Sequence, residues 1–172
     1  VSLASARDGA TARQPWFIYG DTEESQGVEL DLSYNPQQNW QIMIAYSHAT
    51  KAETTRSTVP ARVGLPLAAF PKDVLQLWTK YDVQEGALKG WSFGGGIRDS
   101  SAVPFVADQN LIVKMEAYTT VDALVQYRFK AGERDMVAQL NVKNVFDEEY
   151  REGSFGGFGD PRNFMLSVST KF

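Results

Sequence analysis

The sequence has no cysteine, which excludes a disulfide framework and any metal site built from cysteine ligands. It also lacks an apolar run near the roughly 18 residues that a membrane-spanning helix requires. Basic residues are fewer than acidic ones, 17 against 21, so the net charge of −4 offers no basic surface for nucleic acid. None of these absences excludes a β-barrel membrane protein, because each strand of such a barrel is polar on one face.

What the sequence does contain is a series of segments in which apolar and polar residues alternate. Successive side chains of a strand point to opposite faces, so each segment predicts a strand with one apolar face. The 172 residues are enough for one domain, and they predict eight strands: Ala12–Tyr19, Ser25–Tyr34, Trp40–His48, Asp73–Asp82, Trp91–Arg98, Thr119–Lys130, Val137–Val145 and Phe164–Phe172. The first strand is weak, because Pro15 interrupts it.

The predicted connections alternate in length. Short turns follow the second, fourth and sixth strands, whereas the links at Ala49–Pro71, Asp99–Glu116 and Phe146–Asn163 are long. Outer-membrane barrels have short periplasmic turns and long extracellular loops. The alternation therefore favours a membrane barrel, with its apolar face toward lipid, over a soluble sandwich with that face inward.

Aromatic residues gather where the predicted strands meet the short turns. They lie on or beside the apolar face of their strands: Tyr34, Trp40, Tyr81, Trp91, Phe129 and Phe172. Such a girdle at one level is typical of the interface between a membrane barrel and water. A soluble sheet that caps its core with aromatics is the other interpretation.

The opposite face carries many charged residues, which are rarely buried without a partner. They are Glu29, Asp31, Lys80, Arg98, Asp122, Arg128 and Lys143. A wet or plugged barrel lumen accommodates such charges, and so does the solvent face of a soluble sheet.

Several motifs resemble those of TonB-dependent outer-membrane receptors. The closing signature reads Leu140-Asn-Val-Lys-Asn-Val-Phe-Asp147, then Glu149-Tyr150, Gly159-Asp-Pro-Arg-Asn163 and a last strand that ends in Phe172. Upstream, Ser25-Gln-Gly-Val-Glu-Leu30 is similar to the family's "(K/R)GxE" strand start. Leu77-Trp-Thr-Lys-Tyr81, Gly94-Gly-Gly96 and Tyr118-Thr-Thr-Val-Asp122 resemble the siderophore-receptor subgroup.

The resemblance implies an all-β fold, in which residues 1–172 are the carboxy-terminal part, about the last eight strands, of a roughly 22-stranded antiparallel barrel. The family's amino-terminal plug has no counterpart here, so we expect this chain to be a fragment without its plug domain. The implied location is the outer membrane of a Gram-negative bacterium. Expected partners are membrane lipid, the plug, TonB through the plug, and the barrel assembly machinery through Phe172.

The implied function is import of a ferric siderophore, with energy supplied through TonB. No cofactor, metal site or enzymatic activity is expected. Aromatic rings can pack on an iron chelate and arginines can pair with its anionic oxygens. The long loops supply the candidate ligand-binding residues Arg56, Arg62, Arg151, Phe155, Phe158 and Arg162, and the candidates for contact with the plug are Glu29, Lys80, Arg98 and Arg128. Loop shaping and cross-strand ion pairing are the structural interpretations of the same residues.

Two other interpretations remain open. The chain could be a complete eight-stranded outer-membrane barrel that serves as an anchor or adhesin, or a soluble β-sandwich that binds a partner. Catalysis finds little support, because His48 is the only histidine and no nucleophile motif accompanies it. Gly94-Gly-Gly96 lies within a predicted strand, so we expect it to permit a bend or a close backbone approach.

Overall fold

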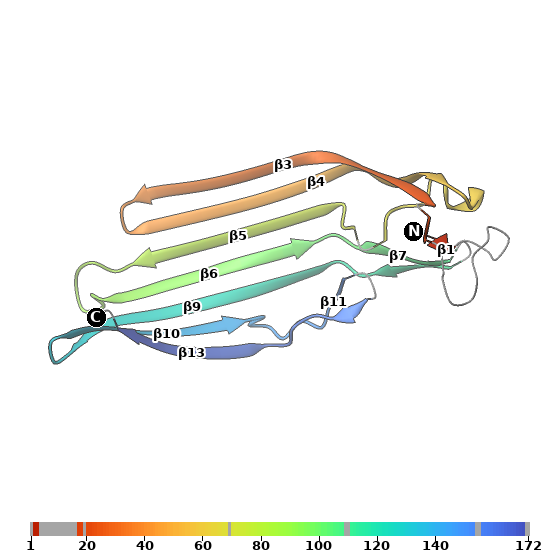
Figure 1. Ribbon diagram of the computed structural model, residues 1–172. Coiled ribbons are helices and arrows are strands. Elements are labelled where there is room, and N and C mark those ends of the chain that lie inside the picture. The colour runs from red at the N-terminus through yellow and green to blue at the C-terminus, as the bar shows by residue number, and fades with distance from the viewer. Residues whose placement is uncertain are drawn as a thin grey trace.

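The computed structural model describes residues 2–3, 17–18, 20–68, 70–108, 111–153 and 156–170. Its main element is an antiparallel sheet of seven strands in the order β13-β10-β9-β6-β5-β4-β3 (Figure 1). In chain order these strands are β3 (Asp21–Gln37), β4 (Trp40–Ser57), β5 (Asp73–Asp82), β6 (Trp91–Ser100), β9 (Tyr118–Ala131), β10 (Arg134–Lys143) and β13 (Asn163–Thr170). The strands follow one another as a meander, as the alternating segments predicted.

The predicted strand bounds are close to the observed ones in the middle of the sheet and too short at one edge. β5 spans the predicted Asp73–Asp82, whereas β3 begins at Asp21 and β4 continues to Ser57. The extra length is a two-stranded extension in which Asp21–Gln26 pair with Lys51–Ser57 beyond the start of β5. Its residues are polar on both faces, so apolar alternation could not reveal it.

The predicted first strand, Ala12–Tyr19, falls mostly outside the described residues. Within it, β2 (Phe17–Ile18) pairs with β1 (Ser2–Leu3) in a separate two-stranded sheet. The predicted first strand, which would make the main sheet eight-stranded, therefore stays a prediction. Phe172, at the predicted end of the last strand, also lies outside the described residues.

The connections have the predicted asymmetry, with short turns at one end of the sheet and long links at the other (Figure 1). The short turns are 38–39, 83–90 and 132–133, and the long links are 58–72, 101–117 and 144–162. The long links contain the 3-10 helix η2 (Pro60–Arg62), the hairpin β7 (Val103–Asp108) with β8 (Leu111–Met115), and the short pair β11 (Arg151–Glu152) with β12 (Gly157–Phe158). We did not foresee the β7–β8 hairpin, because Pro104 interrupts its first strand.

Little of the apolar surface is buried within the described part of the chain. The buried hydrophobic residues there are Val103, Met115, Tyr118 and Leu124. Among the described residues, Figure 1 shows no second layer across either face of the seven-stranded sheet. No helix among the described residues is long and apolar enough to cross a membrane. The arrangement gives the soluble-sandwich interpretation no support, because that fold requires a second sheet against the apolar face.

Candidate functional site: the polar face and the loop at its end

Strand register places the predicted apolar stripes on one face of the sheet. One row across five strands consists of Leu32, Ile44, Leu77, Ile97 and Val121. The neighbouring row, one residue along and on the opposite face, consists of Asp31, Ala45, Gln76, Arg98 and Thr120. The sheet therefore has one apolar and one polar face, as the parity of the sequence predicted.

The apolar face is exposed and ends in an aromatic girdle beside the short turns. Leu166 on β13 is 73% exposed, which is typical of a side chain that meets lipid and unusual for a core position. Trp40 packs edge-on against Tyr81, with ring centroids 6.4 Å apart, and its Nε1 donates to Thr79 Oγ1 at 2.8 Å. The ring centroids of Trp91 and Tyr127 are 4.7 Å apart. Two of the predicted girdle residues thus pack against each other, and Trp91 packs against Tyr127, which the prediction did not include.

A cluster of hydrogen-bonded polar side chains, Tyr46, His48 and Asp73, lies at the other end of the apolar face and is called the Asp73 cluster. Tyr46 donates its hydroxyl to Asp73 at 2.9 Å, and Nδ1 of His48 lies 2.7 Å from the same carboxylate oxygen. The strand from Trp40 to His48 is about 26 Å long, and a tilt of about 40° gives it a vertical height of about 20 Å. That height is close to the roughly 25 Å apolar band of outer-membrane barrels.

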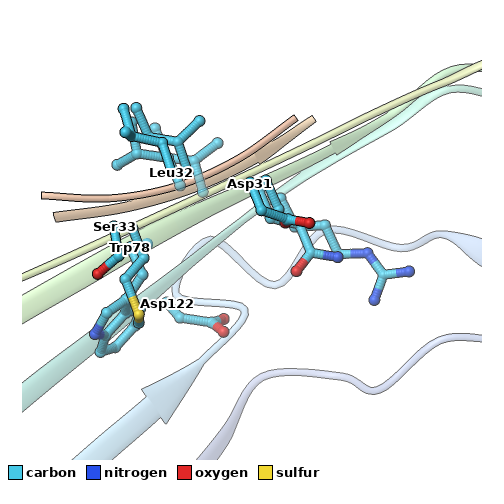
Figure 2. Close-up of a pocket in the computed structure, with 13 residues that line it drawn as sticks. Asp31, Leu32, Ser33, Trp78 and Asp122 are labelled. Atoms are coloured by element: carbon cyan, nitrogen blue, oxygen red, sulfur yellow. The ribbon is translucent and has the colours of Figure 1, made fainter. Parts of the chain in front are cut away.

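The polar face is hollowed by a groove of about 610 Å³ that crosses β3, β4, β5, β6 and β9. Figure 2 shows Asp31, Ser33 and Trp78 on one side of the strands and Leu32 on the other. Asp122 and Arg98 also line the groove. The groove thus combines two carboxylates, a guanidinium and an indole.

The glycine run permits the close approach that we predicted. Trp78 lies over the backbone of β6, and a Cβ on Gly94 would come 3.3 Å from its Cζ2 atom. Trp78 was not among the predicted site residues, and its indole lies on the polar parity of β5.

The charged residues expected to contact a plug differ in their surroundings. Lys80 and Arg128 both pair with Asp82, at 3.3 and 3.5 Å. Arg98 lies at the opposite end of the polar face, near the long loops. Glu29 makes no ion pair within the described residues. Ion pairs with Asp82 therefore occupy Lys80, on the same strand, and Arg128, on β9, whereas Glu29 is available to a partner.

Link 144–162 folds back onto the polar face through an aromatic and ionic cluster. Tyr118 on β9 stacks on Tyr150, with centroids 4.2 Å apart, and donates to Glu152 Oε2 at 3.3 Å. The same oxygen lies 3.8 Å from a terminal nitrogen of Arg98. Burial raises the pKa of the Tyr150 hydroxyl. Tyr118 and Tyr150 belong to motifs that carry the family resemblance, but neither they nor Glu152 were among the predicted site residues.

The start of this link is built around Asn144, which is 3% exposed and has a positive φ of 49°. Its amide donates to the carbonyls of Glu148 and Asp160, at 2.8 and 3.2 Å, and accepts from the Glu148 N–H at 2.9 Å. Asp122 accepts from the Asn144 N–H at 2.9 Å. The signature segment is therefore a scaffold that fixes the loop to the sheet.

The predicted ligand-binding residues lie in the long links but form two separate groups. The guanidinium carbon of Arg151 lies 4.3 Å from the centroid of the Phe158 ring, and the guanidinium donates to the Gly156 carbonyl. Arg162 pairs with Asp147 at 3.6 Å, within the turn that precedes β13. Phe155 lies outside the described residues. The described residues of this group lie in the link that leads into β13, the strand at one edge of the sheet.

The second group lies at the opposite edge, beside β3 and β4. Arg62 in η2 pairs with Asp21 at 2.8 Å, and Arg56 is exposed on the β4 extension. The described chain alone does not bring the two groups together. Their role in ligand binding stays a prediction.

Comparisons with known proteins agree with this geometry. A family profile described as "TonB dependent receptor-like, beta-barrel" matches residues 2–145. The ferrioxamine B receptor of Salmonella typhimurium (strain SL1344) is 32% identical over 163 residues, which cover 92% of this chain and 22% of the receptor. The ferrichrome outer membrane transporter/phage receptor of Escherichia coli (strain K12) is 29% identical over 143 residues, which cover 83% of this chain and 18% of that protein.

A solved structure shares the fold. The ferric preacinetobactin receptor BauA from Acinetobacter baumannii superposes with a TM-score of 0.80 at 22% identity, over 99% of this chain and 25% of that one. The chain thus spans about a fifth of the length of the relatives that it matches.

Proposed function

Because the chain belongs to the TonB-dependent receptor-like β-barrel family, we propose that it is part of the wall of an outer-membrane transporter that imports a ferric siderophore. Members with this barrel lie in the outer membrane of Gram-negative bacteria, and that is the location of this chain. Energy for import comes through TonB, which acts on a plug inside the barrel. The family consists of receptors and transporters, and import makes and breaks no covalent bond.

The observation that carries this proposal is the two-sided sheet. Its exposed apolar face lies between the Trp40–Tyr81 girdle and the Asp73 cluster, as expected of a face that contacts lipid. Its opposite face holds Asp31, Arg98 and Asp122 in a groove, and a wet or plugged lumen accommodates these charges. The matched relatives that bind ferrioxamine B and ferrichrome support a ferric siderophore as the ligand class.

In the proposed transporter the long links face the outside and meet the ligand first. Arg151 and Phe158 are the ligand-binding candidates with the strongest support, because they already form a cation–π pair in an exposed loop. Arg56, Arg62, Phe155 and Arg162 remain candidates on their position alone. The bound iron complex is cargo, and the chain is expected to hold no cofactor of its own.

Lumen charges are proposed to hold the plug. Glu29 has no ion pair in the described residues and faces the lumen from β3, so it is the clearest candidate. Lys80 and Arg128 also remain candidates, because their side chains are partly exposed while they pair with Asp82. Neutralising Arg98 and Arg128 together in the full-length receptor should loosen the plug and raise conductance in a planar bilayer. Unchanged leakage would count against this role.

Iron uptake tests the proposed function directly. The complete gene would be expressed in a Gram-negative host without its own siderophore receptors, and uptake of radioactive iron would be measured with a panel of ferric hydroxamates and catecholates. Uptake of at least one complex should require both the gene and an intact tonB locus. Uptake that is equal with and without TonB would overturn the energetic part of the proposal.

The interpretation as a self-closed eight-stranded anchor gains no support from the geometry. Within the described residues β3 and β13 are the two edges of a seven-stranded sheet and do not pair with each other. Lipid does not tolerate open sheet edges, so the wall must be completed by further strands.

A further inference from the structure

One carboxylate connects the last long link to the polar face. Oε2 of Glu152, on β11, lies 3.8 Å from Arg98 on β6 and 3.3 Å from the Tyr118 hydroxyl on β9. Arg98 also stands 6.0 Å from the centroid of the Tyr118 ring. The side chains of Arg98 and Glu152 are 48% and 45% exposed, so solvent reaches both.

The same arginine borders the groove. Arg98 lines it together with Asp31, Asp122 and Trp78, and it is the cationic side chain among the groove-lining residues. Its guanidinium therefore stands between the space inside the lumen and the loop above it. An arginine presents a planar set of donors that suits the paired oxygens of an anionic chelate as well as a carboxylate.

The contacts to Glu152 are weak enough to be exchanged. A separation of 3.8 Å is longer than a charge-assisted hydrogen bond of about 2.7–2.9 Å, and exposed ion pairs contribute little to stability. The rest of the link is held more firmly, by the hydrogen bonds of Asn144 and by the Tyr118–Tyr150 stack. Loss of the Arg98 contact would thus free the tip of the link and leave its base in place.

We propose that Arg98 is an anion-binding residue at the mouth of the lumen, and that Glu152 occupies it until an anionic iron chelate displaces the carboxylate. The exchange releases the tip of link 144–162 as the ligand enters. This inference rests on the proposed function only in taking the ligand to be a ferric chelate, and it narrows the preferred ligands to those with negative charge.

Trypsin cleavage after Arg151 measures the release without any ligand. The receptor that contains this chain would be digested in isolated outer membranes, and the peptide that ends at Arg151 would be quantified against the one that ends at Arg62. Arg98→Gln removes the charge that pairs with Glu152 and leaves the residues on both sides of the cleaved bond unchanged, so cleavage after Arg151 should rise by up to about fivefold, the upper end for an exposed ion pair. Glu149→Gln, which removes a charge elsewhere in the same link, is the control and should leave the rate unchanged.

Two iron complexes test the exchange. The trianionic iron(III) tris-catecholate should accelerate cleavage after Arg151 in the wild-type receptor, and the neutral iron(III) tris-acetohydroxamate should not, with sodium chloride used to equalise ionic strength. Arg98→Gln should be cleaved quickly from the start and respond to neither complex. Equal rates for Arg98→Gln and wild type, or equal acceleration by both complexes, would overturn the proposal.

Failure of the exchange at Arg98 can be distinguished from failure of the proposed transport function. Cleavage in isolated membranes needs neither TonB nor transport, so a missing exchange with intact TonB-dependent uptake removes only the role of Arg98. Absent uptake with a normal exchange removes the transport proposal and retains the anion site.

Discussion

Trp78 on β5 lies so close to Gly96 on β6 that Gly96 has no room for a side chain. A Cβ there would stand 2.5 Å from Cε3 of Trp78 and 2.9 Å from the Leu77 carbonyl oxygen. The two residues are direct cross-strand partners on the polar face. Glycine at position 96 therefore allows the Trp78 indole to lie against the backbone of β6.

Gly96→Ala should lower the stability of the barrel by about 1–3 kcal/mol, because the added methyl forces Trp78 out of its position. Gly95→Ala is the control in the same run, since its Cβ meets only the Asp122 carbonyl at 3.4 Å. The temperature at which the receptor loses its folded mobility on a gel would report both effects. A similar loss in the two variants would show that the contact with Trp78 is not the cause.

Asn144→Ala should loosen link 144–162 and leave the sheet intact. The change removes three side-chain hydrogen bonds, and each buried group left unpaired costs about 1–3 kcal/mol. Hydrogen exchange of peptides from this link should rise, while that of β9 and β10 should not. Asn144→Asp keeps the acceptor for the Glu148 N–H, so its effect should be intermediate.

The two faces of the sheet can be distinguished by fluorescence in brominated lipid. In variants that retain a single tryptophan, the emission of Trp40 should be strongly quenched, because this residue lies in the exposed girdle. The emission of Trp78, which lines the groove, should be quenched much less. If Trp78 were quenched as strongly as Trp40, the assignment of lumen and lipid faces would be wrong.

The β3–β4 extension should loosen in acid. A hydrogen bond from Lys51 lowers the pKa of Glu24 below its ordinary value of 4.5, and one from Ser57 lowers the pKa of Asp21 below 3.8. A carboxylate with a lowered pKa in the folded state adds stability above its unfolded pKa, and this stability is lost as the pH falls through the folded pKa. Protection of residues 21–26 and 51–57 from hydrogen exchange should therefore decline below about pH 4.5.

Lys51→Gln provides the check on this pH dependence. It removes the partner that lowers the pKa of Glu24, so protection above pH 4.5 should fall and the acid-induced change should shrink. Lys89→Gln, in the β5–β6 turn, should leave the profile as in the wild type. Identical profiles for the two variants would contradict a role for the half-buried Glu24–Lys51 pair.

Local sequence was a sufficient guide wherever the membrane imposes a simple rule. Lipid on one side and water on the other require strict alternation, so the parity of Leu32, Leu77 and Leu166 assigned their faces correctly. The rule fails beyond the membrane, where both faces of a strand meet water. For that reason the extension of β4 to Ser57 could not be predicted, whereas the β7–β8 hairpin was missed because of Pro104.

The candidate site was only partly accessible from sequence. Arg151 and Phe158 were both candidates in the last long link, and they are in contact. Arg162 was a further candidate, and its described contacts are with Asp147 and the Val145 carbonyl, in the turn before β13. Loop residues follow no period, so their partners depend on how the chain folds back.

The sequence by itself determined the class of strand, the faces and the alternation of turns and loops, because each follows from side-chain direction along a single extended segment. Only the tertiary structure decided which residues meet. It brought Glu152 to Arg98 across 54 positions of sequence, set Trp78 on Gly96, and built the loop around Asn144. Those contacts depend on register between strands and on long-range folding of a loop, and neither leaves a local trace in the order of residues.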